Sequence, residues 1–220
     1  MKIHKNPLPE PLALFGGTFD PVHYGHLRCA EEARRKLGLQ TLYLLPAGDP
    51  PHRPGPQATT LQRLRMLQLA LPEFPNLDID QRELDRHGPS YMVDTLRDLR
   101  KEAPQRPVLL LIGQDAANLL HSWHRWMELF TLAHLVIMTR PGSKAEYRQD
   151  LADQIQERRV IDASELARSG AGGVMDLVVS AVDISATSIK SRVRSGLSAR
   201  GMLPAAVLDY IERHGLYLTD

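Results

Sequence analysis

Residues 12–26 read LALFGGTFDPVHYGH, an apolar run followed at once by two glycines and then by two histidines. The apolar residues 12–15 predict a buried strand, and the spacing of apolar positions in residues 27–37 predicts a helix. Gly16 and Gly17 allow the chain to turn sharply and let the backbone approach a ligand closely. A strand, a glycine-rich turn and a helix in this order are typical of a site where backbone amides and a helix start bind an anion.

Two histidines mark the start of the predicted helix. His23 and His26 lie three residues apart, so we expect both imidazoles on one face of the first helical turn, directed toward the anion. Thr18 adds a hydroxyl donor, and the combination favours a polyphosphate. The alternatives are that the histidines cap the helix, fill the core, or bind a metal ion together with Asp20.

Composition limits the classes of partner. The chain has 220 residues and a formal net charge of +1, which argues against a nucleic-acid binder with a broad cationic face. The only cysteine, Cys29, falls in the first predicted helix, so no disulfide can form within the chain and a cytoplasmic location is expected. No apolar run approaches the roughly 20 residues of a membrane span, so no membrane partner is expected.

Strand and helix patterns alternate along the rest of the chain. Further strands are predicted at residues 41–45, 77–80, 108–112, 135–138 and 176–180, and further helices at residues 61–71, 91–102, 187–194 and 204–215. Thr59 or Thr60 is the expected cap of the helix at residues 61–71. The pattern predicts an α/β fold, a doubly wound and mostly parallel sheet, with residues 1–220 as a single domain ending in C-terminal helices. Residues 142–173, polar and charged, are expected to form a helix and a loop, as an insertion or a mobile segment.

A second anion site is predicted at residues 184–192, which read ISATSIKSR. Three hydroxyl groups open the predicted helix and two basic side chains follow one turn later: Ser185, Thr187, Ser188, Lys190 and Arg192. The alternative is an ordinary helix cap followed by surface cations. Because ligands of open α/β sheets bind beyond the carboxyl ends of strands, we expect both anion sites at one crevice.

Both segments resemble a known family. Residues 16–26 are similar to the GTFDPxHxGH signature of the nucleotidyltransferase superfamily with the HxGH motif, and residues 184–192 are similar to its ISSTxIR or ISATxIR segment. The resemblance implies a Rossmann-like fold that binds ATP through the residues Gly16, Gly17, Thr18, Phe19, His23, His26, Asp115, Ser185, Thr187, Ser188, Lys190 and Arg192. Asp115 would accept a hydrogen bond from a ribose hydroxyl, with a helix cap as the alternative. Lys190 stands where many relatives have arginine, so Arg192 is expected to share its contact with phosphate.

Phosphates held between two helix starts fit in-line attack of an acceptor phosphate on the α-phosphorus of ATP, which expels pyrophosphate. This chemistry requires no nucleophile from the protein. His23 and His26 are therefore expected to act catalytically as donors that neutralise charge on the phosphoryl oxygens. Mg²⁺ is expected to bridge the nucleotide phosphates, and no protein metal site is predicted.

Four further segments narrow the range of acceptor substrates. They are residues 50–53 (PPHR), 89–91 (PSY), 112–115 (IGQD) and 122–123 (SW). Together with the two motifs they resemble the bacterial nicotinate-nucleotide adenylyltransferase family. The resemblance implies transfer of the adenylyl group of ATP to nicotinate mononucleotide, giving nicotinate adenine dinucleotide and pyrophosphate in NAD biosynthesis.

The acceptor would be held by aromatic planes, backbone amides and cations. Tyr91 and Trp123 offer planes for a pyridine ring, and the amides of Ser90, Tyr91 and Met92 open a predicted helix that suits a carboxylate. The acceptor's phosphate would be bound by His52, Arg53 and Arg140. The alternatives are two core aromatic residues and three exposed loop residues.

Three other functions stay open on the sequence. Transfer to phosphopantetheine is the nearest within the superfamily. Metal-dependent hydrolysis would use Asp20, His23 and His26 as ligands. A nucleotide sensor that catalyses nothing would use the same fold. The oligomeric state is left open as well.

Overall fold

In the part of the chain that the structure describes, six strands form one sheet in the order β3-β2-β1-β4-β5-β6. The computed structural model describes residues 9–48, 55–86, 88–180 and 182–219. The strands are β1 (Leu12–Gly17), β2 (Leu42–Pro46), β3 (Leu77–Ile79), β4 (Val108–Gly113), β5 (His134–Thr139) and β6 (Val174–Val178). The pairs β2–β3, β4–β5 and β5–β6 are parallel. This strand order is that of Rossmann-type sheets, so the predicted α/β fold is confirmed.

The chain divides into two units. The first unit consists of the residues up to Leu14 with Tyr91–Val178, and the second of Phe15–Ser90 with the residues from Val179 onward. The expectation that residues 1–220 form a single domain stays a prediction.

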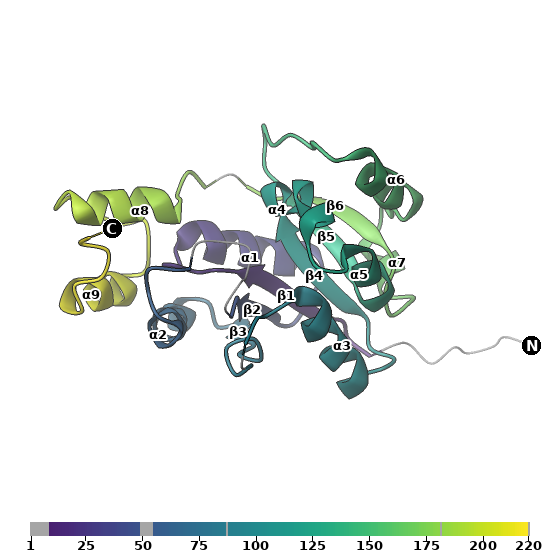
Figure 1. Ribbon diagram of the computed structural model, residues 1–220, viewed down its shortest axis with the longest axis horizontal. Helices are drawn as coiled ribbons and strands as arrows, with labels where there is room; N and C mark the ends of the chain where they lie inside the picture. The colour runs from purple at the N-terminus through teal and green to yellow at the C-terminus, as the bar shows by residue number, and fades with distance from the viewer. Residues whose placement is uncertain (1–8, 49–54, 87, 181, 220) are drawn as a thin grey trace, which may run out of the picture. The chain divides into compact units, whose positions relative to one another are not determined.

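The second unit contains four of the longer helices: α1 (Tyr24–Lys36), α2 (Thr60–Ala70), α8 (Ala186–Arg194) and α9 (Ala205–Arg213). Helix α2 packs on α9, and the two lie side by side in Figure 1. Thr59 caps α2 through a reciprocal pair, since its hydroxyl accepts from the Gln62 amide and the Gln62 side chain accepts from the Thr59 amide. The predicted cap at Thr59 is thus confirmed.

The buried face of α2 includes a charged residue. Its buried residues are Arg63, Met66, Leu67 and Ala70, which recur at helical spacing, whereas Leu61 is 76% exposed. An arginine therefore occupies the core side of this helix. The apolar residues of positions 61–71 lie on more than one face of the helix, so their spacing alone does not show that Arg63 is buried.

The first unit holds α3 (Met92–Glu102), α4 (Gln114–Asn118), α5 (Trp126–Leu132), α6 (Gln149–Glu157) and α7 (Ala163–Leu166). Helices α3 and α5 pack together, and the guanidinium of Arg97 joins them by an ion pair of 2.7 Å with Glu128. The sequence analysis missed α4 and α5. Both are short, and α5 follows Arg125, whose left-handed backbone (φ 52°) interrupts any helical pattern before it.

Residues 142–173 contain α6 and α7 as well as a segment held on α4. The Asn118 side chain donates to the Lys144 carbonyl at 3.0 Å and accepts from the Glu146 amide at 3.0 Å. The Gln114 side chain donates to the Tyr147 hydroxyl at 2.9 Å. These contacts fix residues 144–147 against the end of β4.

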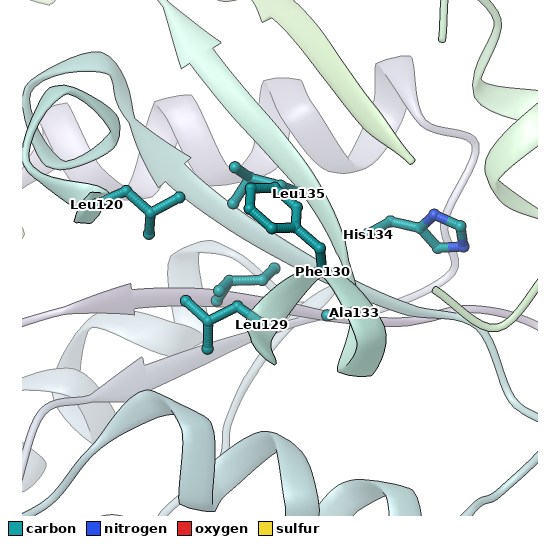
Figure 2. A pocket seen from close by; sticks show the side chains of 7 residues that line it. Leu120, Leu129, Phe130, Ala133, His134 and Leu135 are labelled. Atoms are coloured by element: carbon teal, nitrogen blue, oxygen red, sulfur yellow. The ribbon is translucent and has the colours of Figure 1, made fainter. Parts of the chain in front are cut away.

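An apolar pocket lies beside β4 and β5 in the first unit. Figure 2 shows Leu120, Leu129, Phe130 and Leu135 gathered around it, while the imidazole of His134 points the other way. His134 instead accepts a hydrogen bond at Nδ1 from the Gly173 amide, so its proton is on Nε2 and is donated to the Ser169 carbonyl, both at 2.9 Å. The pocket has no converging polar groups and belongs to the core.

No helix of the part of the chain that the structure describes combines the length and the apolar character needed to cross a bilayer.

Candidate active site

The predicted turn glycines, Gly16 and Gly17, are the last two residues of β1, so the turn lies after them, in residues 18–23 between β1 and α1. A Cβ added to Gly17 would lie 2.8 Å from Cζ of Phe19, so this position requires glycine unless the ring moves. Phe19 has a left-handed backbone, with φ of 50°, which costs an ordinary residue about 1–2 kcal/mol. Its ring is buried, so any contact of Phe19 with ATP has to come from its backbone. Such strain is common where a loop binds a ligand.

His23 and His26 form a stacked pair at the start of α1. Their ring centroids lie 3.7 Å apart with 29° between the planes, and the edge of the Phe19 ring packs on His26 at 5.1 Å. His23 is the N-cap and is 5% exposed. The helix begins at Tyr24, three residues before the predicted start, because the prediction relied on apolar spacing that residues 24–26 lack. The two imidazoles nevertheless share one face, as their spacing predicts.

Gly25 brings the start of α1 against the segment that leads into α8. A Cβ on Gly25 would lie 2.8 Å from Nδ1 of His23 and 2.9 Å from the carbonyl oxygen of Ile184. The Tyr24 amide, one of the donors that a helix start leaves open, bonds to the Met202 carbonyl at 3.0 Å. The starts of α1 and α8 are therefore neighbours within the second unit.

The start of α8 carries the predicted hydroxyl groups. Ser185 is the N-cap, and its hydroxyl accepts from the Ser188 amide at 3.1 Å. Ser185, Thr187 and Ser188 are all exposed. One hydroxyl thus caps the helix, while Thr187 and Ser188 lie exposed in its first turn, where a helix start can bind an anion.

A buried carboxylate lies in the turn between these helix starts. The Asp20 carboxylate accepts from the amides of Gln57 and Ala58 at 3.0 and 3.1 Å and from the Tyr217 hydroxyl at 2.7 Å, and it pairs with the Lys190 ammonium. Burial would raise the pKa of this carboxyl, but the hydrogen bonds from Lys190, Tyr217 and Gln57 outweigh burial and lower it. Asp20 is therefore a charged anchor for four segments of the second unit.

Both basic residues of the predicted phosphate site hold protein oxygens. Lys190 pairs with Asp20 and is 19% exposed at its side chain, and Arg192 donates from Nε to the Ser198 carbonyl at 2.7 Å. Arg192 remains exposed overall. Contact of either side chain with phosphate stays a prediction.

Arg63 places a second cation behind the turn. Its side chain is fully buried, and Nη1 donates to the Thr18 carbonyl at 2.9 Å. Burial lowers the pKa of Arg63, while the nearby Asp20 charge opposes that shift, and an arginine stays charged in either case. The guanidinium engages the Thr18 carbonyl from inside the protein.

The remaining predicted residues are divided between the units. Ser90 belongs to the second unit, where its hydroxyl accepts from Arg86 at 3.4 Å. Tyr91, Met92, Asp115, Trp123 and Arg140 belong to the first unit. Asp115 and Arg140 are exposed, on α4 and directly after β5. His52 and Arg53 lie outside the described residues.

Tyr91 and Trp123 are not core residues, since both are only partly buried. Tyr91 is the N-cap of α3, and its ring lies 4.5 Å from the ring of His124, with 36° between the planes. Met92 is the first residue of α3, so the amides of Tyr91 and Met92 do open a helix. The sequence analysis missed His124, although it directly follows Trp123.

Arg63 and Tyr217 were missed too. The spacing of Arg63 with Met66, Leu67 and Ala70 was the available signal for Arg63. Nothing in the local sequence marks Tyr217, which lies 197 residues from its partner Asp20.

The metal-binding alternative receives no support from the geometry. Among the described residues, no three or more His, Cys, Asp and Glu side chains gather in a way that suits a metal ion. Asp20 directs its carboxylate to protein donors instead.

Known proteins are similar to this chain over nearly its whole length. A family model described as cytidylyltransferase-like matches residues 14–192. A probable nicotinate-nucleotide adenylyltransferase of Methylococcus capsulatus is 49% identical over 207 residues, covering 94% of this chain and 99% of the relative. One of Dechloromonas aromatica is 46% identical over 214 residues, covering 96% and 99%.

A solved structure supports the fold independently. The Plasmodium falciparum nicotinic acid mononucleotide adenylyltransferase, complexed with NaAD, matches with a TM-score of 0.72 and covers 96% of this chain and 99% of its own. Its sequence is only 14% identical, so this likeness concerns the fold alone.

Proposed function

The chain belongs to the cytidylyltransferase-like family and, within it, to the nicotinate-nucleotide adenylyltransferases, and on this premise we propose that it transfers the adenylyl group of ATP to nicotinate mononucleotide. The products are nicotinate adenine dinucleotide and pyrophosphate, a step of NAD biosynthesis. The observation that carries this proposal is the stacked pair of His23 and His26 at one helix start, beside the hydroxyl-rich start of α8.

The reaction is a single displacement at phosphorus. A phosphate oxygen of the acceptor forms a bond to the α-phosphorus of ATP, the bond from that phosphorus to the oxygen bridging to the β-phosphate breaks, and pyrophosphate leaves. His23 and His26 donate hydrogen bonds to phosphoryl oxygens as negative charge grows there. One such donor contributes roughly 100- to 1,000-fold in rate.

ATP is bound through its phosphates and its ribose. The turn at Gly16, Gly17, Thr18 and Phe19 and the α8 residues Ser185, Thr187, Ser188, Lys190 and Arg192 hold its phosphates, and Asp115 accepts from its ribose. Mg²⁺ would arrive with ATP as part of the substrate, since this ion is commonly bound through substrate phosphates.

Nicotinate mononucleotide is bound through charge and stacking. The amides of Tyr91 and Met92 at the start of α3, with that of Ser90, hold the carboxylate, and Tyr91 and Trp123 hold the ring. His52, Arg53 and Arg140 hold its phosphate. Residues 1–220 act in this proposal as one nucleotidyltransferase domain. The single reduced Cys29 supports a cytoplasmic enzyme.

An acceptor screen tests the proposal. Purified protein with ATP and Mg²⁺ receives nicotinate mononucleotide, nicotinamide mononucleotide or phosphopantetheine, and pyrophosphate and the dinucleotide are measured. We expect nicotinate mononucleotide to be preferred over its amide by roughly 10- to 100-fold, since the amide loses hydrogen bonds to a charged group. Equal use of both pyridine nucleotides contradicts the carboxylate assignment, and preference for phosphopantetheine contradicts the substrate.

The same screen separates the other classes. A metal-dependent hydrolase would release phosphate from a phosphoester without ATP. A sensor would bind ATP but release no pyrophosphate with any acceptor.

A further inference from the structure

Four charged or polar side chains from distant parts of the second unit meet at one buried point. We call Asp20, Arg63, Lys190 and Tyr217 the Asp20 cluster. Asp20 is 5% exposed, Tyr217 is 5% exposed and Arg63 is 0% exposed. The Asp20 carboxylate accepts from two side chains and two backbone amides. Burial of a charged group is unfavourable in free energy unless such partners are well placed.

The Tyr217 phenol reaches this point from beyond the last helix. Helix α9 ends at Arg213, and Tyr217 then adopts a left-handed backbone with φ of 66°. That conformation is strained for an aromatic residue. The bend directs the hydroxyl to Asp20 at 2.7 Å and leaves the Lys190 ammonium 5.0 Å from the centre of the Tyr217 ring.

The cluster touches both helix starts that the proposed reaction uses. Asp20 lies three residues before His23, the N-cap of α1, and Lys190 lies five residues after Ser185, the N-cap of α8. The pair of Lys190 with Asp20 therefore ties one helix start to the other. Lys190 pairs with the Asp20 carboxylate, and Arg63, which donates to the Thr18 carbonyl, also interacts with the Asp20 charge. The cluster therefore has two positive charges and one negative charge.

We propose that Asp20 and Tyr217 are positioning residues of the ATP phosphate site, which hold the start of α8 against the start of α1 through Lys190. They touch no substrate themselves. This inference rests on the proposed function and extends it to the C-terminal segment. It predicts an effect on ATP in particular, because the cluster acts on the two phosphate-binding helix starts of the second unit.

The test removes one oxygen and compares two tyrosines. Tyr217→Phe deletes the hydroxyl that donates to Asp20 but keeps the ring beside Lys190. Tyr210→Phe in α9 is the matched control, since Tyr210 lies in the same C-terminal region and its ring packs on His214 away from the cluster. For each protein, KM for ATP, KM for nicotinate mononucleotide, kcat and the melting temperature are measured.

We expect Tyr217→Phe to raise KM for ATP about tenfold, the scale of one hydrogen bond to a charged group, with KM for nicotinate mononucleotide unchanged. Tyr210→Phe should match the wild type. A Tyr217→Phe enzyme with wild-type KM for ATP, or with both KM values raised equally, overturns the proposal.

A second variant covers the case in which Tyr217→Phe folds poorly. Asp20→Asn keeps the shape of the side chain and removes the charge that holds Lys190, so KM for ATP should rise by more than it does in Tyr217→Phe. An unchanged KM for ATP in Asp20→Asn also overturns the proposal. Failure of the proposed function looks different, because the wild type itself would then form no dinucleotide.

Discussion

At the level of single residues, the HxGH segment (residues 23–26) supplies hydrogen-bond donors, and its two histidine rings also pack on each other. His23 and His26 stack on each other, and a side chain at Gly25 between them would collide with the His23 ring and with the Ile184 carbonyl. Phe19 closes the arrangement by meeting His26 edge-on. The two imidazoles are thus preorganised before any ligand arrives, which is the condition for efficient stabilisation of a charged transition state.

Gly25→Ala should disrupt this arrangement. The new methyl group would lie 2.8 Å from the His23 ring and 2.9 Å from the Ile184 carbonyl, so the ring or the backbone must move. We expect a loss of about 1–3 kcal/mol in the free energy of unfolding, typical of overpacking, and a large fall in kcat. Urea unfolding and steady-state kinetics measure both.

Gly38→Ala provides a contrast. A Cβ on Gly38 meets no atom within 4 Å, and only its positive φ of 67° opposes the substitution. That variant should lose stability but keep its kcat. Wild-type kcat in Gly25→Ala would show that the positions of the imidazoles do not matter.

The positions of the candidate site residues relative to one another could be predicted where the signal is local. The turn, the histidine pair and the hydroxyls of α8 are contiguous motifs, and the structure places the two helix starts side by side. Tyr217 and Arg63 could not be predicted in the same way. The first is brought to Asp20 only by the path of the whole chain, and the second is an arginine on the buried face of a leucine-rich helix.

At the scale of the element, buried strands were the easiest to predict. The apolar run of β4 is buried from Val108 to Ile112, and its continuous character is typical of a central parallel strand. Helices α4 and α5 were missed because five and seven residues are too few to show a period of 3.6. Two boundaries shifted. Strand β6 begins two residues before the predicted start, with the apolar Val174 and Met175, and α1 begins three residues before its predicted start, because residues 24–26 lack the apolar spacing on which the prediction relied.

Strand β5 begins with a histidine whose protonation should affect stability. Burial lowers the pKa of His134 below its ordinary value, and the hydrogen bond to Ser169 only partly opposes that shift. The unfolded chain therefore binds this proton more readily than the folded protein does. The contribution of His134 to stability is complete above about pH 6.5 and is lost as the pH falls through the lowered pKa.

Unfolding experiments between pH 7.5 and about pH 5 check this expectation, in comparison with His134→Gln. The variant lacks the titrating group, so its free energy of unfolding should fall less steeply with decreasing pH, even though it starts lower. Equal slopes for the two proteins would mean that the folded protein and the unfolded chain bind a proton at His134 equally well, which contradicts a lowered pKa.

At the scale of the whole molecule, the two units carry different parts of the proposed chemistry. The second unit contains both phosphate-binding helix starts and the Asp20 cluster. The first unit contains α3 and the aromatic residues Tyr91 and Trp123 proposed for the pyridine ring. Fold class and strand alternation followed from the sequence, whereas the division into units did not, because it depends on contacts that no local pattern shows.

In the proposed reaction, the imidazole pair of His23 and His26 catalyses adenylyl transfer by donating hydrogen bonds to phosphoryl oxygens. The most direct measurement is kcat for formation of nicotinate adenine dinucleotide by His23→Ala at saturating ATP and nicotinate mononucleotide, beside the wild type and His124→Ala. We predict a loss of roughly 100- to 1,000-fold for His23→Ala and a far smaller change in kcat for His124→Ala. A folded His23→Ala enzyme with wild-type kcat would contradict the account.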